Sequence, residues 1–162
     1  MRAVVLDRRS RVLLQAYRDP SVHRPGGRPH ANPVWIVPGG GLAADEDASA
    51  GLVRELLEET GLRDVGWGPW LWRRSVDLVY QGRVRRFEER YRLGTIERQA
   101  PPVRPVALEQ HERSVLLGHH WWCLADLAAY TGTVYPPRLA ARLREVLAGH
   151  VPTTEVDITS EG

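Results

Sequence analysis

The 162-residue chain contains no lysine, so all 22 of its basic residues are arginine, and its single cysteine is Cys123. One cysteine excludes an internal disulfide and a metal site built from several cysteines. No apolar run approaches the roughly 20 residues that a membrane-spanning helix needs. The chain begins Met-Arg-Ala-Val-Val-Leu-Asp, which indicates a first strand and not a signal peptide. We therefore expect a cytoplasmic protein without a membrane partner.

Charge is distributed unevenly along the chain. Residues 1–36 hold seven Arg against two Asp, residues 37–64 hold two Arg against seven acids, and residues 73–104 hold nine Arg against four acids. An acidic centre flanked by arginine-rich segments suits a metal ion that bridges a polyphosphate, because guanidinium groups bind phosphate oxygens in bidentate fashion. Solvated side chains are the competing explanation for any single arginine. The net charge of +2 is too small to indicate a nucleic-acid partner.

Three carboxylates stand close together in the acidic segment, at Glu55, Glu58 and Glu59. Spacings of three and four residues place side chains on one face of a helix, within reach of a common point. Like charges in that arrangement repel one another unless something neutralises them, and a divalent cation with oxygen ligands would do so. The competing interpretation is an ordinary solvated helix face, on which Arg54 and Glu58 form a surface ion pair.

The residues around these carboxylates predict a strand, a glycine loop and a helix. The apolar run at residues 34–37 predicts a buried strand that ends at Pro38. The glycines at 39–41 allow close backbone approach, and the acids at 45–47 favour the start of a helix. Gly61 is suited to the helix end. The apolar stripe that should face the protein body consists of Ala48, Leu52, Val53, Leu56 and Leu57.

The segment from Gly40 to Leu62 resembles the Nudix box, G-x5-E-x7-R-E-U-x-E-E-x-G-U, in which U is an aliphatic residue. It matches at every defined position, namely Gly40, Glu46, Arg54, Glu55, Leu56, Glu58, Glu59, Gly61 and Leu62. The resemblance to the Nudix hydrolase family extends loosely to about Gly149. It implies a single α+β domain over residues 1–149, with a mixed β-sheet sandwiched between helices (α/β/α), followed by a C-terminal tail over residues 150–162.

The resemblance also implies a reaction, the hydrolysis of a phosphoanhydride bond in a nucleoside diphosphate linked to another group. Its members use Mg²⁺ or Mn²⁺, which screens phosphate charge and acidifies a bound water. By resemblance, Glu55, Glu58 and Glu59 hold the ion, and the Gly39 carbonyl is a further candidate ligand. Arg54 is expected to pair with a box carboxylate and to hold its orientation.

The general base is a separate question. Some family members use the box glutamate that corresponds to Glu55, which we favour here, and others use an acid on a later loop. Glu109 and Glu112 lie in a suitable loop, although each also fits a solvent-exposed loop acid. Glu46 is expected to support the box loop and not to contact the metal.

Substrate selection depends on residues beyond the box. A tyrosine about 16 to 18 positions past it is associated with dinucleoside polyphosphate hydrolases, and Tyr80 stands 18 residues beyond Leu62. A tyrosine in a strand also fits sheet packing. The long loop at residues 18–33 is typical of a binding segment, and Arg18 at its start is a candidate substrate ligand. We expect nucleoside polyphosphates or dinucleoside polyphosphates first, then ADP-ribose or nucleotide sugars.

The alternative function is a Nudix-fold sensor module that binds a nucleotide without turning it over. Such modules commonly lose box carboxylates or carry a DNA-binding domain, and this chain keeps the carboxylates, which favours the enzyme. The expected partner is a small nucleotide, and nucleic acid is not expected. Dimers are frequent among relatives, so a homodimer remains an open expectation.

The rest of the chain predicts mainly strands. A hairpin is expected over residues 3–16, separate strands at 67–72 and 76–80, a turn at 81–83, and two more strands through Phe87 and over 90–96. Residues 97–113 read as a loop because of their prolines. A strand at 119–123 and helices at 124–130 and 137–148 follow.

Overall fold

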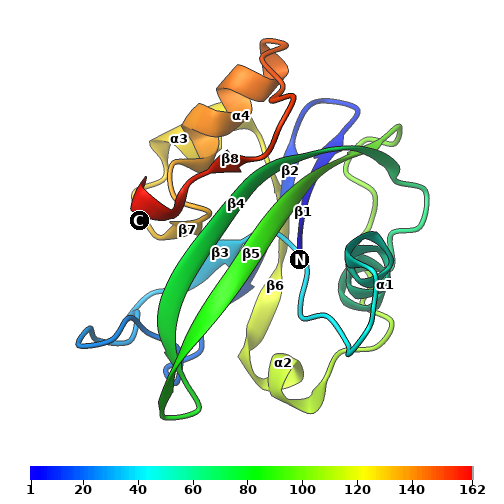
Figure 1. The fold of residues 1–162 in the computed structure, drawn as a ribbon. Helices are drawn as coiled ribbons and strands as arrows, with labels where there is room; N and C mark the ends of the chain where they lie inside the picture. The colour runs from blue at the N-terminus through cyan, green and yellow to red at the C-terminus, as the bar shows by residue number, and fades with distance from the viewer. Residues whose placement is uncertain (162) are drawn as a thin grey trace.

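In the computed structural model, which describes residues 1–161, eight strands form one mixed sheet in the order β7–β3–β2–β1–β5–β4–β8, and β6 pairs with β2 beside that path (Figure 1). Pairing is parallel for β1–β5, β3–β7 and β4–β8, and antiparallel for the other pairs. The strands are β1 Arg2–Asp7, β2 Val12–Tyr17, β3 Val34–Ile36, β4 Gly66–Tyr80, β5 Arg83–Ile96, β6 Leu116–Trp122, β7 Val134–Tyr135 and β8 Val156–Asp157.

Helices cover both faces of this sheet, which gives the α/β/α arrangement expected from the sequence. Side chains alternate along β1, because successive residues of a strand point to opposite faces. Val4 and Leu6 join a core beneath α3 (Leu124–Ala129) and α4 (Leu139–Leu147), whereas Ala3 and Val5 join a core beneath α1 (Ala48–Thr60). In Figure 1, α1 lies on one side of the sheet, and α3 and α4 lie on the other.

The predicted box helix is confirmed as α1, with clear signals at both ends. Asp47 is its N-cap, and its side chain accepts hydrogen bonds from the backbone N–H groups of Ser49 and Ala50. Gly61 ends the helix in the left-handed conformation, at φ 71°. A Cβ at Gly61 would stand 2.4 Å from the Arg104 carbonyl oxygen, so glycine also permits the close approach of the following segment.

Two strand predictions were wrong in their boundaries. Residues 67–72 and 76–80 belong to one continuous strand, β4, and the two strands expected after the turn are one strand, β5. The polar stretch Arg73–Ser75 breaks the apolar pattern but pairs in register with residues 88–90 of β5. The register shifts instead between Trp67 and Trp70 and again between Trp70 and Trp72. The first shift spans Gly68 and Pro69, residue types that favour a bulge.

The segments expected to lack regular structure also differ. The predicted loop at 97–113 includes the first residues of a short helix, α2 (Gln110–Val115). Beyond residue 149, β8 pairs with β4, and the following Ile158 is buried in the core under α3 and α4. Residues 150–158 therefore contribute to the packed structure, although they follow the proposed domain boundary. No helix within residues 1–161 is long and apolar enough to cross a membrane.

Candidate active site

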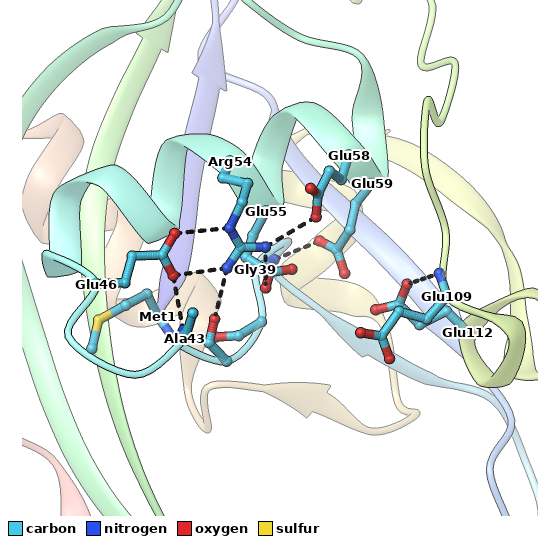
Figure 2. Close-up of polar contacts among 12 residues, drawn as sticks. Met1, Gly39, Ala43, Glu46, Arg54, Glu55, Glu58, Glu59, Glu109 and Glu112 are labelled. Atoms are coloured by element: carbon cyan, nitrogen blue, oxygen red, sulfur yellow. Dashed lines mark hydrogen bonds and ion pairs between the residues drawn. The ribbon is translucent and has the colours of Figure 1, made fainter.

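Three carboxylates from α1 and α2 lie close together. Glu55 and Glu59 come from α1 and Glu112 from α2, and each offers an oxygen that lies within 4.8 Å of the others (Figure 2). Glu59 is 2 % exposed, and Glu55 and Glu112 are partly buried. Two elements far apart in the sequence thus supply one acidic cluster.

Hydrogen bonds attach α2 to the end of β2 and the loop that follows it. The N–H of Arg18 donates to the Val115 carbonyl oxygen at 2.9 Å, which joins α2 to the end of β2. His111 Nε2 lies 2.7 Å from Asp19 Oδ2. At the N-cap of the helix, the Glu109 N–H donates to Glu112 Oε2 at 2.8 Å. These contacts place the Glu112 carboxylate toward the box.

Glu59 is held by two donors in a site with little access to water. The Gly39 N–H donates to its Oε2 at 2.7 Å, and the Tyr17 hydroxyl donates to its Oε1 at 3.2 Å. Burial raises the pKa of Glu59 to about 7, and the charge of Arg2 opposes this shift only in part. Burial also raises the pKa of Glu55. Carboxylates that resist ionisation at such short separations fit a bound cation, because a cation favours their charged form.

Arg54 pairs with three acids of the box. Its Nε and Nη2 donate to the two carboxylate oxygens of Glu46 at 2.8 and 2.9 Å, and its Nη1 donates to Glu55 and Glu58 at 3.0 Å each. Glu46 also accepts from the Ala43 N–H at 3.0 Å, which ties the box loop to the helix. This geometry fits the orienting role expected for Arg54 and the supporting role expected for Glu46. Glu58, a predicted ligand, is ion-paired here and lies outside the cluster of three.

The Gly39 carbonyl, the other predicted ligand, accepts a hydrogen bond from Arg2 Nη1 at 2.6 Å. Gly39 has φ 129°, and a Cβ there would lie 2.2 Å from the Met1 carbonyl oxygen. Glycine is therefore needed for the box loop to lie against the first strand. Gly39 thus contacts Arg2 through its carbonyl oxygen and Glu59 through its N–H, so this residue connects β1 to the acidic cluster.

A buried charge network next to the cluster was missed at the sequence level. Glu89 accepts from Arg2 Nε at 3.2 Å, from Arg74 Nε at 2.8 Å and from the Tyr91 hydroxyl at 2.7 Å. Burial alone would raise the pKa of Glu89, but Arg2 and Arg74 outweigh burial and lower it to about 2. The sequence offers one signal for this network, a run of charged residues inside a predicted strand. That run does not show which residue Glu89 pairs with.

The acidic cluster opens into a cavity of about 380 Å³. Arg2, Arg18, Arg24 and Arg74 line it, so cationic side chains surround the carboxylates. Its apolar lining consists of Val22, Val34, Ile36, Val76, Leu78 and Val115, with Tyr17, Tyr80 and Tyr135 as aromatic members.

Both predicted substrate residues, Arg18 and Tyr80, line this cavity. Tyr80 makes edge contacts with Phe87 and His111, at centroid distances of 6.0 and 6.4 Å. It therefore also has a packing role. Of the two loop acids considered as bases, Glu112 belongs to the carboxylate cluster, and Glu109 lines the cavity without joining it.

A model of the NUDIX domain matches residues 1–148, nearly the whole chain. The chain therefore belongs to the Nudix family, as the complete box and the α+β fold indicate. No curated protein sequence matches it.

Solved structures show the same fold at low sequence identity. A MutT protein from Methanosarcina mazei Go1 superposes with a TM-score of 0.58 at 15 % identity, covering 92 % of this chain and 91 % of that one. An Ap4A hydrolase from C. elegans gives 0.56 at 17 % identity, with 91 % and 93 % covered. An ADP-ribose pyrophosphatase from Streptococcus suis gives 0.54 at 15 % identity, with 96 % and 93 % covered.

Proposed function

We propose that this protein is a metal-dependent hydrolase of the phosphoanhydride bond in a nucleoside diphosphate linked to another group. The observation that carries the proposal is the cluster of Glu55, Glu59 and Glu112, which opens into a cavity lined by arginines. A carboxylate cluster suits a divalent cation, and guanidinium groups suit phosphate oxygens. The two features together suit a metal-bound polyphosphate better than either does alone.

The donor set fits Mg²⁺ or Mn²⁺. All three ligating groups are carboxylates, and these ions prefer oxygen ligands and keep several waters that phosphate oxygens can replace. Such an ion would screen the phosphate charge and lower the pKa of a bound water. Glu58 lies one helical turn from Glu55 and would join the set if its hydrogen bond to Arg54 opened, so we also propose Glu58 as a metal ligand.

The residues of the chain take the other roles. Glu55, whose pKa burial raises, is our proposed general base and takes the proton of the attacking water on a carboxylate oxygen. Arg54 holds Glu55 through the 3.0 Å hydrogen bond from Nη1. Arg18 is proposed to bind phosphate oxygens, and Tyr80 is proposed to contact the nucleoside. The apolar wall at Ile36, beside the tyrosines, offers a surface for a nucleobase.

The substrate class follows our ranking from the sequence. The structures that share this fold bear names that refer to Ap4A, ADP-ribose and UDP-linked substrates, and each name concerns that protein. Tyr80 in the cavity supports dinucleoside polyphosphates, which we place with nucleoside polyphosphates as the first choice. ADP-ribose and nucleotide sugars come next.

A nucleotide panel tests this proposal. We expect metal-dependent cleavage of one substrate class when nucleoside triphosphates, diadenosine polyphosphates, ADP-ribose and nucleotide sugars are incubated with Mg²⁺ or Mn²⁺. Products are separated by chromatography, so that monophosphates are seen directly. EDTA should abolish cleavage, and added Mg²⁺ should restore it. Nucleotide binding without cleavage of any panel member would contradict the enzyme and support the sensor module.

A further inference from the structure

A second cavity, of about 330 Å³, lies beside the first at the edge of β4. Its lining residues are Arg24, Pro25, Arg74, Ser75, Val76, Asp77 and Thr159. Three of these, Arg24, Arg74 and Val76, line the first cavity as well. The two spaces are therefore neighbours that share lining residues.

The second cavity lies along a part of the β4 edge that has no neighbouring strand within residues 1–161, between the pairing with β8 and the bridge to His23. On one side β8 pairs with β4 up to Arg73, and the Ser75 N–H donates to Thr159 Oγ1 at 3.0 Å. On the other side His23 bridges to Val79, and the Val79 N–H donates to the His23 carbonyl oxygen at 2.7 Å. That bridge places the next residue, Arg24, at the opening.

Arg74 is the feature that points to a ligand. It is 5 % exposed, and its Nε donates to Glu89 Oε2 at 2.8 Å. Its guanidinium carbon lies 4.9 Å from the centroid of the Tyr135 ring. Within residues 1–161, no protein acceptor bonds its two Nη groups. These Nη groups are not among the fully buried atoms of the described residues that lack a partner, so they are accessible from the two cavities that Arg74 lines. An anionic ligand there could accept charge-assisted hydrogen bonds from them.

Charge around the second cavity favours an anion. The carboxylate of Glu89 is already bound by Arg2, Arg74 and Tyr91. Asp77, the one acid in the cavity lining, is paired with Arg86 through two hydrogen bonds, at 2.9 and 3.0 Å. The positive charge of Arg24 and the Nη donors of Arg74 are thus left to face the cavity.

We propose that Arg24 and Arg74 form a second anion subsite, which binds a phosphate group that the substrate carries beyond its scissile diphosphate. The part about the substrate rests on the proposed function, whereas the binding of an anion does not. Two guanidinium groups that converge on one phosphate give charge-assisted hydrogen bonds, which are among the strongest that proteins form. The protein should therefore prefer nucleotides with an additional phosphate over the same nucleotides without it.

The direct probe is inorganic phosphate in the presence of EDTA. Without a cation the carboxylate cluster repels anions, so saturable phosphate binding seen by ³¹P NMR reports on the arginines. We expect Arg24→Ala and Arg74→Met each to weaken that binding by about tenfold, which corresponds to ~1.4 kcal/mol. Arg28→Ala is the matched control, because Arg28 is exposed in the same loop and lines neither cavity. It should bind phosphate as the wild type does.

A second arm uses ligands that lack a phosphoanhydride bond and so are not turned over. Calorimetry with Mg²⁺ compares 5′-AMP with adenosine 2′,5′- and 3′,5′-bisphosphate. We expect at least one bisphosphate to bind about tenfold more tightly to the wild type, and the preference to vanish in Arg24→Ala, which alters an exposed side chain and leaves the Glu89 pair intact. No phosphate binding in EDTA, or binding that survives both substitutions, would overturn the subsite. If the nucleotide panel showed no cleavage but phosphate bound as expected, the proposed function would be contradicted and the anion subsite would not.

Discussion

Glu59→Gln is expected to lower kcat/KM by about 10³-fold, equivalent to ~4 kcal/mol of transition-state stabilisation. The substitution keeps the size of the side chain but removes one charge from the carboxylate cluster. The expected cause is the loss of a ligand for the metal ion. Folding should be almost unaffected, because burial disfavours the ionised form of Glu59 and raises its pKa to about 7.

The measurement is steady-state turnover over a range of Mg²⁺ concentrations, with thermal unfolding recorded on the same samples. Glu109→Gln is the matched control, because Glu109 lines the same cavity but lies outside the cluster. That variant should stay within a few-fold of the wild type. If Glu59→Gln turned over at the wild-type rate in excess Mg²⁺, Glu59 would not be a ligand.

Glu89→Gln is expected to have the largest effect on stability. Removing the charge leaves Arg2 and Arg74 without their shared anion, and breaking a buried ion pair from one side typically costs about 3–5 kcal/mol. Glu89 also accepts the Tyr91 hydroxyl, so three contacts depend on this carboxylate. Chemical denaturation at pH 7 measures the free energy of unfolding of both proteins.

The stability difference should depend on pH in a defined direction. The pKa of Glu89 falls to about 2 from an ordinary value of 4.5, since Arg2 and Arg74 outweigh the opposite effect of burial. Because the pKa is lower in the folded state than in the unfolded state, Glu89 stabilises the fold by on the order of 3 kcal/mol above pH 4.5. This stabilisation is lost as the pH falls toward 2. Wild type and Glu89→Gln should therefore converge at low pH.

Glu88→Gln provides the control for this experiment. Glu88 is the preceding residue of β5, is exposed, and accepts a hydrogen bond from Ser75 Oγ at 2.7 Å. Its substitution should change the unfolding free energy by less than about 1 kcal/mol. A Glu89→Gln variant as stable as Glu88→Gln at pH 7 would show that the Arg2–Glu89–Arg74 network does not stabilise the fold.

The parts of the fold that short-range patterns define could be predicted. The box helix has the predicted capping acid at Asp47 and the terminal glycine at Gly61. The predicted apolar stripe was wrong in part, because Leu52 and Leu56 are buried whereas Val53 is 46 % exposed. The two-residue strands β7 and β8 have no such pattern, because they exist only through their partners β3 and β4. The prediction divided each of the long strands β4 and β5 because charged residues interrupt the apolar pattern. In the structure these charged residues pair with each other across the hairpin, which keeps both strands continuous.

The site shows the same division between local and long-range information. Helical spacing brought Glu55 and Glu59 together, and the structure confirms that they are neighbours. The same spacing placed Glu58 with them, but the Glu58 carboxylate is paired with Arg54 and lies outside the cluster. Glu112 reaches the cluster because α2 is bonded to the end of β2, and nothing near Glu112 in the sequence specifies that contact. Arg2 and Glu89 are separated by 87 residues and meet through the parallel pairing of β1 with β5.

Direct measurement of Mn²⁺ binding by electron paramagnetic resonance tests most simply whether Glu112 completes a metal site with the box glutamates. The wild type should bind Mn²⁺ saturably without nucleotide. Glu112→Gln keeps an oxygen that can accept the Glu109 N–H, so α2 should remain in place while the cluster loses one charge. Its dissociation constant should rise by at least about tenfold, or ~1.4 kcal/mol, whereas Glu109→Gln should match the wild type. Equal Mn²⁺ affinity in the wild type and Glu112→Gln would contradict a three-carboxylate site.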